Sequence, residues 1–274
     1  MSDEYFSVNK KKWNELARKH YENEPQHVKD FIKKKDVLNP LEIEEVGDVK
    51  GRKLLHLQCH FGMDTLSWNM RGALVTGVDF SEVAVANARD LAKKIGADAT
   101  FINCNIYDLQ DHLDSKFDIV FTSYGAISWL DDLDKWAGII AHYLNPGGFF
   151  YAADAHPFAV IFDNDDGDEN GISITYDYFD SKNPVKFDED GSYMDSTIKL
   201  ENTVEYGWNH SMSEIVNSLT KHGLFIDWIH EHPRICWKLF NILEQKEDGW
   251  WYWPEKYAKK RFPLLFSLKA TKLK

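Results

Sequence analysis

The spacing of apolar residues predicts where helices and strands alternate along the chain. Before residue 50, apolar positions recur every three or four residues in two groups, which are Trp13, Leu16, Ala17, Tyr21 and Val28, Phe31, Ile32. This spacing predicts two short helices at the start of the chain. From residue 54 onward, short apolar runs predict strands at 54–59, 74–80, 99–106, 117–124 and 148–155, separated by stretches with helical spacing.

Capping residues support these boundaries. Ser81 is placed to begin a helix that Gly96 ends, and Ser211 with Glu214 forms a capping box for a later helix that stops at Gly223. Two more strands are predicted at 224–231 and 264–273. Strands that alternate with helices predict an α/β fold in which a mostly parallel sheet is covered on both faces.

The alternation breaks between residues 157 and 205. This stretch is rich in Asp, Asn and Gly, and residues 163–190 contain ten acidic residues against two lysines. Only short strand-like runs occur in it, at 172–179 and 197–205. We expect a β-rich insertion after the fifth strand that acts as a lid, and an ordinary solvated antiparallel excursion is an equally good interpretation.

Composition and charge narrow the class of protein. The 274 residues are 43% hydrophobic and carry a net charge of −12. We expect one domain over residues 1–274, with residues 1–50 as a helical cap. The negative charge disfavours nucleic acid as a partner. The three cysteines, the absence of a signal-like start and the absence of a long apolar run lead us to expect a cytoplasmic protein without membrane contact.

The segment 54–79 carries the strongest chemical signal. A buried strand enters a tight turn at residues 58–62, a helix follows, and Asp79 ends the next strand. Ligands of open α/β sheets bind outside the carboxyl ends of the strands. Gly62 would let the backbone approach a ligand closely, and a carboxylate at Asp79 can accept both hydroxyls of a ribose. The pattern therefore predicts a cofactor that contains adenosine.

The composition of this turn argues against a dinucleotide. A pyrophosphate needs the bare backbone of a G-x-G-x-x-G loop, but Gln58, His60 and Phe61 fill this turn and leave one glycine. S-adenosylmethionine has no phosphate and tolerates larger residues. An NAD(P)-dependent oxidoreductase is kept as an alternative that the filled turn disfavours.

Five motifs together resemble the class I S-adenosylmethionine-dependent methyltransferases, in particular the bacterial small-molecule enzymes of the UbiE/type 11 group. They lie at 54–62, 78–81, 103–109, 117–120 and 144–148, and the resemblance covers about 53–155 and 211–273. It implies a three-layer Rossmann-like fold with seven strands in the order 3-2-1-4-5-7-6, the last strand antiparallel.

The resemblance also implies the residues that would bind S-adenosylmethionine. Asn105 would face the adenine amino group and the amide of Ile106 a ring nitrogen. The full set is His56, Gln58, Cys59, Gly62, Asp79, Phe80, Asn105, Ile106, Ser123 and Tyr124. The family carries an acidic residue where His56 stands, and glycines at 58 and 60. The resemblance therefore does not specify how the methionine end of the cofactor is held.

Other residues are candidates for the acceptor side. His156, His210 and Tyr124 are candidate catalytic residues, although either histidine could instead cap a turn or a helix. The predicted substrate pocket consists of Trp13, His20, Tyr21, Trp129 and His156. Cys59 is interpreted as a packing residue rather than a reactive thiol, and His230 with His232 lacks a third ligand, so no metal site is expected.

These observations predict transfer of a methyl group from S-adenosylmethionine to a small-molecule acceptor by in-line substitution, with S-adenosylhomocysteine as product. The expected protein is a monomer or a homodimer. Two alternatives from other classes are a non-catalytic S-adenosylmethionine-binding protein and a nucleic-acid methyltransferase. The second is weakened by the charge of −12 and by the absence of an Asn/Asp-Pro-Pro-aromatic motif.

Overall fold

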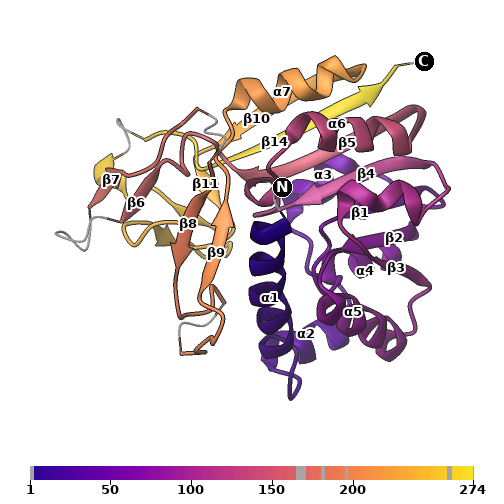
Figure 1. Cartoon of the computed structure of the whole chain (residues 1–274), viewed down its shortest axis with the longest axis horizontal. Coiled ribbons are helices and arrows are strands. Elements are labelled where there is room, and N and C mark those ends of the chain that lie inside the picture. Colours follow the sequence, from indigo (N-terminus) through magenta and orange to yellow (C-terminus); the bar gives the residue numbers. More distant parts are fainter. Residues whose placement is uncertain (1–2, 165–170, 180–182, 195–196, 258–260, 274) are drawn as a thin grey trace.

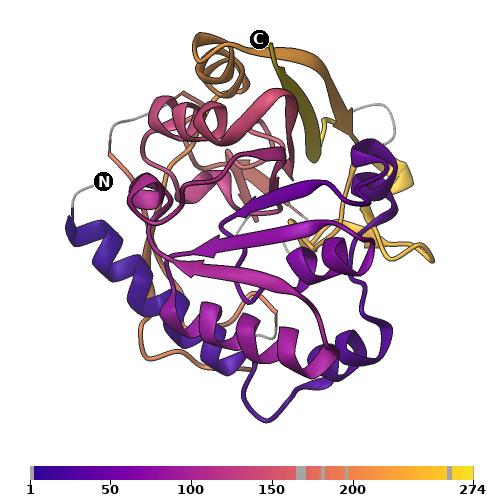
Figure 2. The same cartoon turned by 90° about the vertical axis from the view of Figure 1, so that its right-hand side faces the viewer.

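A mixed seven-stranded sheet forms the centre of the computed structural model, which describes residues 3–164, 171–179, 183–194, 197–257 and 261–273. The strands run in the order β10-β14-β5-β4-β1-β2-β3 (Figures 1 and 2). Their bounds are β1 Lys53–Leu57, β2 Leu74–Asp79, β3 Ala99–Asn103, β4 Phe117–Ser123, β5 Leu144–Ala155, β10 Leu224–His232 and β14 Leu265–Lys272. The last strand, β14, runs antiparallel to both of its neighbours. The predicted order and the antiparallel last strand are confirmed.

Helices cover both faces of the sheet, as the alternating pattern predicts. On one face, α6 (Leu133–Tyr143), α7 (Met212–Lys221) and the 3-10 helix η1 (Ile106–Asp111) pack on apolar side chains from the strands. The other face is covered by α3 (Pro40–Val46), α4 (Met63–Met70) and α5 (Glu82–Ile95). Adjacent residues divide between the faces, since Leu54 and Leu55 belong to opposite cores.

The predicted caps are present. The side chain of Ser81 accepts a hydrogen bond from the Ala84 amide at the start of α5, and Gly96 ends that helix in the left-handed region. The third strand ends earlier than predicted, at Asn103 rather than at residue 106. It stops there because Asn105 caps η1 by accepting from the Tyr107 amide.

The N-terminal region contains three helices instead of the two that we predicted. They are α1 (Asp3–Lys19), α2 (Gln26–Lys34) and α3. The sequence signal for α3 is the capping box between Asn39 and Glu42, with Pro40 at the first helical position. In Figure 1, α1 lies alongside β9 (Val204–Gly207). Asn9 exchanges two hydrogen bonds with the backbone of Tyr206 there, at 2.7 and 2.8 Å.

The region after β5 is built from short antiparallel pairs, as predicted. β6 (Phe162–Asn164) pairs with β7 (Ile172–Ile174), and β8 (Val185–Asp188) pairs with β9. The strand predicted at 172–179 ends at Ile174, and the one predicted at 197–205 is wrong except at its end, because β9 begins at Val204 and runs to Gly207. Half of the ten acidic residues, those at 165–169 and 180, lie outside the described residues. The remaining elements are η2 (Ile127–Trp129), β11 (Arg234–Ile235), β12 (Glu244–Gln245), β13 (Trp251–Tyr252) and η3 (Glu255–Tyr257).

The tryptophan-rich stretch near the C-terminus serves packing. Trp250 and Trp253 are buried in a cluster with Phe240 and Leu264, beside the end of the sheet. This position agrees with a role in packing against the sheet. In the described part of the chain, no helix combines the length and apolar character that crossing a bilayer requires.

Candidate cofactor site

The turn after β1 keeps a left-handed backbone at three positions. Gln58, His60 and Gly62 have φ values of 57°, 49° and 80°. The first two are positions where the resembled family carries glycine. A residue with a side chain is less stable in the left-handed backbone region by about 1–2 kcal/mol. Contacts around the turn must therefore hold Gln58 and His60 in this conformation. The turn is fixed by hydrogen bonds from the Cys59 amide to Val78 and from the Gly62 amide to Cys59, both at 2.9 Å.

Gly62 is required for packing, and its close approach to a ligand stays a prediction. The sequence suggested close approach of the backbone to a ligand. In the structure, a Cβ at this position would lie 2.7 Å from the ring of Phe101 and 3.0 Å from Ala88. The glycine therefore permits α4 to begin against β3 and α5. Its positive φ adds a second reason against any side chain.

Asp79 lies where the sequence placed it, at the carboxyl end of β2. It is 5% exposed, and its two oxygens accept from the amides of His60 at 2.8 Å and Ser81 at 2.9 Å. Burial raises the pKa of Asp79 to about 6, and these amide hydrogen bonds only partly counteract it. Because a carboxylate has about four acceptor positions, it can still accept both hydroxyls of a ribose.

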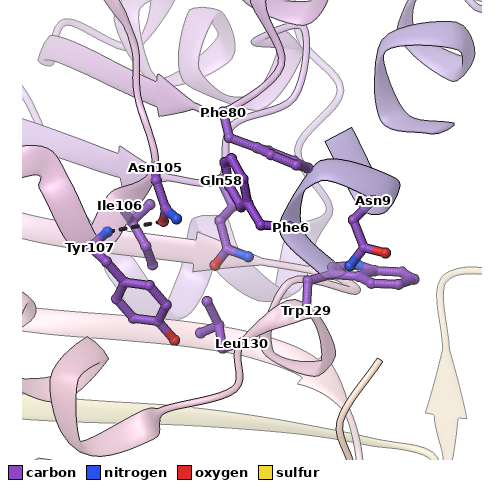
Figure 3. Close-up of a pocket in the computed structure, with 9 residues that line it drawn as sticks. All are labelled: Phe6, Asn9, Gln58, Phe80, Asn105, Ile106, Tyr107, Trp129 and Leu130. Atoms are coloured by element: carbon purple, nitrogen blue, oxygen red, sulfur yellow. Dashed lines mark hydrogen bonds between the residues drawn. The ribbon is translucent and has the colours of Figure 1, made fainter. Parts of the chain in front are cut away.

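A pocket opens between the sheet and α1, and Phe80, the residue after Asp79, lines it (Figure 3). Five of the residues that line it were predicted, namely Gln58, Phe80, Asn105, Ile106 and Trp129. Four were missed, namely Phe6, Asn9, Tyr107 and Leu130. Phe6 and Asn9 could have been found, because they precede Trp13 by seven and four residues on one face of the same helix.

The Asn105 side chain borders the pocket, and its Oδ1 accepts from the Tyr107 amide at 3.1 Å (Figure 3). This bond fixes the direction of the amide group, whose NH₂ can donate to a ligand. Phe6 and Phe80 lie in contact, with ring centroids 5.4 Å apart. The pocket therefore combines apolar rings with the oriented side-chain amides of Asn9, Gln58 and Asn105, which suits a flat heterocycle such as adenine.

The residues expected at the methionine end occupy the carboxyl ends of β1 and β4. His56 is 2% exposed, with Nδ1 placed 2.8 Å from Oγ1 of Thr65, and burial lowers the pKa of its imidazole to about 3. Ser123 donates from Oγ to Oδ2 of Asp64 at 2.8 Å. His56 is therefore neutral, and the acidic group at this end is Asp64, a residue that the sequence motifs did not identify.

Cys59 is buried, and that burial raises the pKa of its thiol well above the usual range. Its Sγ would lie 2.9 Å from a Cβ at Gly77. A thiol with these neighbours is a poor nucleophile. The position agrees with the packing role that we predicted.

Trp13 connects four segments of the chain. Its ring centroid lies 5.6 Å from that of His60, 5.3 Å from Trp129 and 6.1 Å from Tyr193. His20 is 1% exposed, with Nε2 placed 2.6 Å from Oγ of Ser192. The structure thus places Trp13 against Trp129, and Tyr193 from the insertion contacts both Trp13 and His20. That these residues line a substrate pocket stays a prediction.

Tyr21 does not join this group. Its hydroxyl donates to Asp90 of α5 at 2.7 Å, and the Lys94 ammonium lies 5.1 Å from the centre of its ring. Tyr21 therefore ties the end of α1 to the outer side of α5. The expectation that it lines the substrate pocket does not agree with these contacts.

The three candidate catalytic residues are all engaged in other contacts, and His156 shows this most clearly. Nδ1 of His156 accepts from the Phe158 amide at 3.0 Å, and Nε2 donates to Glu231 at 2.9 Å. A histidine with both nitrogens bonded has no lone pair for a substrate proton. The contacts match the turn-capping alternative.

His210 and Tyr124 are held in a similar way. Nε2 of His210 donates to the Leu130 carbonyl at 2.7 Å, and Nδ1 faces Glu214 at 3.1 Å. The Tyr124 hydroxyl donates to Glu42 at 2.5 Å. These bonds position the loop at Leu130 and connect β4 with α3. In this arrangement, neither side chain offers a free base to an acceptor.

Comparison with known proteins shows which family and which folds this chain resembles. Residues 54–148 match the family described as a methyltransferase domain. Among solved structures, a putative S-adenosylmethionine-dependent methyltransferase from Listeria monocytogenes is 19% identical, with a TM-score of 0.59 over 85% of this chain and 98% of that one. One from Mesorhizobium loti is also 19% identical, with a TM-score of 0.57 over 85% and 96%.

Residues 54–148 therefore resemble a methyltransferase domain, and the chain shares the fold of solved S-adenosylmethionine-dependent methyltransferases. A curated relative, the ubiquinone biosynthesis O-methyltransferase of Pseudomonas syringae pv. tomato, is 28% identical over 130 residues. The match covers 46% of this chain and 56% of that protein. The chain thus spans little more than half the length of this relative, and the likeness concerns the methyltransferase domain.

Proposed function

We propose that this protein transfers a methyl group from S-adenosylmethionine to a small-molecule acceptor. The observation that carries the proposal is the position of Asp79, a buried carboxylate oriented by two amides directly before Phe80, which lines a pocket of apolar rings. When bound, the sulfonium supplies an activated methyl group, which passes in line to the acceptor while S-adenosylhomocysteine leaves. The chain has to align the acceptor and exclude water.

Different pocket residues would bind the ribose and the adenine of the adenosine. Asp79 would accept the two ribose hydroxyls, and the amide of Asn105 would face the adenine. The rings of Phe6 and Phe80 and the side chain of Leu130 would enclose the base. This arrangement needs no phosphate site, and the side chain of Gln58 lies where a pyrophosphate would require bare backbone.

Residues 1–50 and the insertion at 157–205 would together form a cover over this site. Nζ of Lys12, which is 2% exposed, lies 2.9 Å from Oε1 of Glu205. The Glu15 carboxylate accepts from the amides of Glu201 and Asn202 at 2.8 and 2.9 Å. A buried ion pair and a carboxylate held by backbone make α1 and the insertion one unit. Saturating cofactor and acceptor should slow proteolysis within residues 1–50 and 157–205. Unchanged cleavage would contradict the role of a cover.

The acceptor would lie among Trp13, Trp129, Tyr193 and His20. Among the described residues, Nδ1 of His20 has no hydrogen-bond partner, although the atom is buried. Burial lowers the pKa of His20 to about 4, so its imidazole is neutral at physiological pH. We favour His20 over His156 and His210 as the group that accepts a proton from the acceptor.

The expected acceptor is a small molecule rather than a nucleic acid, because the chain carries a net charge of −12. All three cysteines are unpaired, which suits a reducing compartment such as the cytoplasm. A monomer or a homodimer would be compatible with a site that one chain completes.

The direct test is turnover. Purified protein is incubated with methyl-labelled S-adenosylmethionine and a panel of metabolites, and S-adenosylhomocysteine and labelled products are measured by mass spectrometry. We expect S-adenosylhomocysteine and a labelled product to form only with one class of acceptor, and neither to form with the Asp79→Asn variant. Tight cofactor binding with no product from any acceptor would favour a non-catalytic binding protein.

A further inference from the structure

The methionine end of the cofactor site lacks a charge on the strand where the family carries one. That end of S-adenosylmethionine bears an ammonium group, and a buried ammonium requires an acceptor, above all a negative one. His56 stands at the carboxyl end of β1, but its imidazole is 2% exposed and bonded to Thr65. A neutral ring so placed cannot balance a positive charge.

A carboxylate lies one hydrogen bond away on the next element. Asp64 is in the first turn of α4, and its Oδ2 accepts from Oγ of Ser123 at 2.8 Å. The same Oγ lies 3.5 Å from Nε2 of His56. Ser123 thus holds Asp64 beside the position that the family's acidic residue would occupy.

Asp64 has no positive partner in the described part of the chain, where the ion pairs all involve other carboxylates. Its removal from water raises its pKa, and the Ser123 hydroxyl counteracts this only in part. Asp64 is half-buried, and a carboxylate partly removed from water with no cation beside it is a favourable place for one. The arrangement favours a cation that arrives with a ligand.

Gln58 supplies an independent observation. Its Nε2 donates to the Ala126 carbonyl at 2.8 Å, which fixes the orientation of the side-chain amide. Its Oε1 is buried and has no hydrogen-bond partner among the described residues. Gln58 also lines the pocket. An acceptor oriented in this way and left unsatisfied calls for a donor from a bound molecule.

We propose that Asp64, held by Ser123, and Oε1 of Gln58 receive the ammonium group of the methionine end. The inference rests on the proposed function, because it requires that cofactor. The negative charge has moved from the end of β1 to the first turn of α4, and His56 has become a neutral support for Ser123. An ammonium group has three donors, and the two side chains provide acceptors for it.

The competing explanation is that Asp64 only stabilises the start of α4, where a carboxylate is favourable. A pair of ligands separates the two. S-adenosylhomocysteine carries the ammonium group, and its desamino analogue keeps the adenosine, the thioether and the carboxylate but lacks that group. Binding of both is measured by calorimetry to the whole chain and to Asp64→Asn, with thermal unfolding as a check of folding.

We expect Asp64→Asn to weaken S-adenosylhomocysteine binding about 10- to 100-fold, as for loss of a charged hydrogen-bond partner. Binding of the desamino analogue should change by less than about threefold, because it has no group that Asp64 would bind. Asp79→Asn is the matched control, and it should weaken both ligands alike. If Asp64→Asn does not fold, Ser123→Ala should show the same selectivity at a smaller size, about 3- to 10-fold.

Equal loss of affinity for both ligands, or no loss for either, would overturn the assignment of Asp64 while leaving the proposed function in place. Failure of the folded parent protein to bind S-adenosylhomocysteine at all would overturn the proposed function together with this inference. A selective loss in Asp64→Asn supports both.

Discussion

The two ends of the cofactor site differ in how closely they follow the sequence pattern. At the adenosine end, Asp79, Phe80 and Asn105 stand where the motifs placed them. At the methionine end, the backbone keeps its left-handed turn while Gln58 and His56 replace the residues that the pattern leads one to expect. The difference shows that this turn keeps its left-handed path although Gln58 and His60 stand where the resembled family carries glycine.

The largest effect should come from adding a methyl group at the end of the turn. Gly62→Ala forces a side chain into the left-handed region and against Phe101, where the Cβ would lie at 2.7 Å. We expect a loss of about 3 kcal/mol in the free energy of unfolding. Gly147→Ala is the matched control, because its φ is 79° and no atom lies within 4 Å of its Cβ. Equal losses in the two variants, measured with denaturant, would rule out the packing explanation.

At the adenosine end, Asp79→Ala should weaken binding of S-adenosylhomocysteine by about 1.5–3 kcal/mol. The reason is the loss of a charged acceptor that also holds the amides of His60 and Ser81. Asp98→Ala, at an exposed loop position, serves as the control in the same titration. An affinity within about twofold of the parent would show that Asp79 does not contact the ribose.

Near the methionine end, Glu42 is a buried carboxylate whose pKa is raised to about 7 by burial, with the Tyr124 hydroxyl counteracting part of the effect. A raised acid pKa in the folded state means that stability is lost as pH rises from about 4.5 through 7. Glu42→Gln resembles the protonated form. We therefore expect it to unfold like the parent at about pH 5 and to be about 1–3 kcal/mol more stable at about pH 8.

A variant less stable than the parent at the higher pH would show instead that Glu42 is charged and well compensated. Tyr124→Phe is a useful companion, because it removes the hydroxyl that donates to Glu42. Without this hydroxyl, the charged form of Glu42 is less stable, so Tyr124→Phe should lose more stability than the parent between about pH 5 and about pH 8. Both variants are compared with the parent by denaturant unfolding.

The smallest effect is expected for His60→Gly. Glycine relieves a φ of 49°, and the loss of the ring contacts with Trp13 and Phe61 offsets the gain. We expect a change within about 1 kcal/mol in the free energy of unfolding. A large loss would show that the imidazole, rather than the backbone, holds the turn.

Most of the fold could be predicted because periodicity and caps report directly on local structure. Ser81 and Gly96 bound α5 as expected, and the sheet order followed from the resemblance. The end of β3 was missed because Asn105 turns the chain with its side chain. The short strand pairs near Trp251 depend on contacts that apolar spacing does not report.

The site was predictable only in part, for a similar reason. Motif position identifies Asp79 and Asn105, because strand ends meet at one edge of the sheet. It cannot identify Asp64, whose role depends on a hydrogen bond to Ser123 from another element. Nor can it show that His156 and His210 are already bonded at both nitrogens.

Both ends of the site matter only if the pocket that Phe80 lines binds the adenosine of S-adenosylmethionine. The most direct test is a calorimetric titration of the parent protein with S-adenosylhomocysteine and, separately, with NAD and NADP. We predict saturable binding of S-adenosylhomocysteine and none of either dinucleotide. Micromolar binding of a dinucleotide, with no response to S-adenosylhomocysteine, would contradict this central claim.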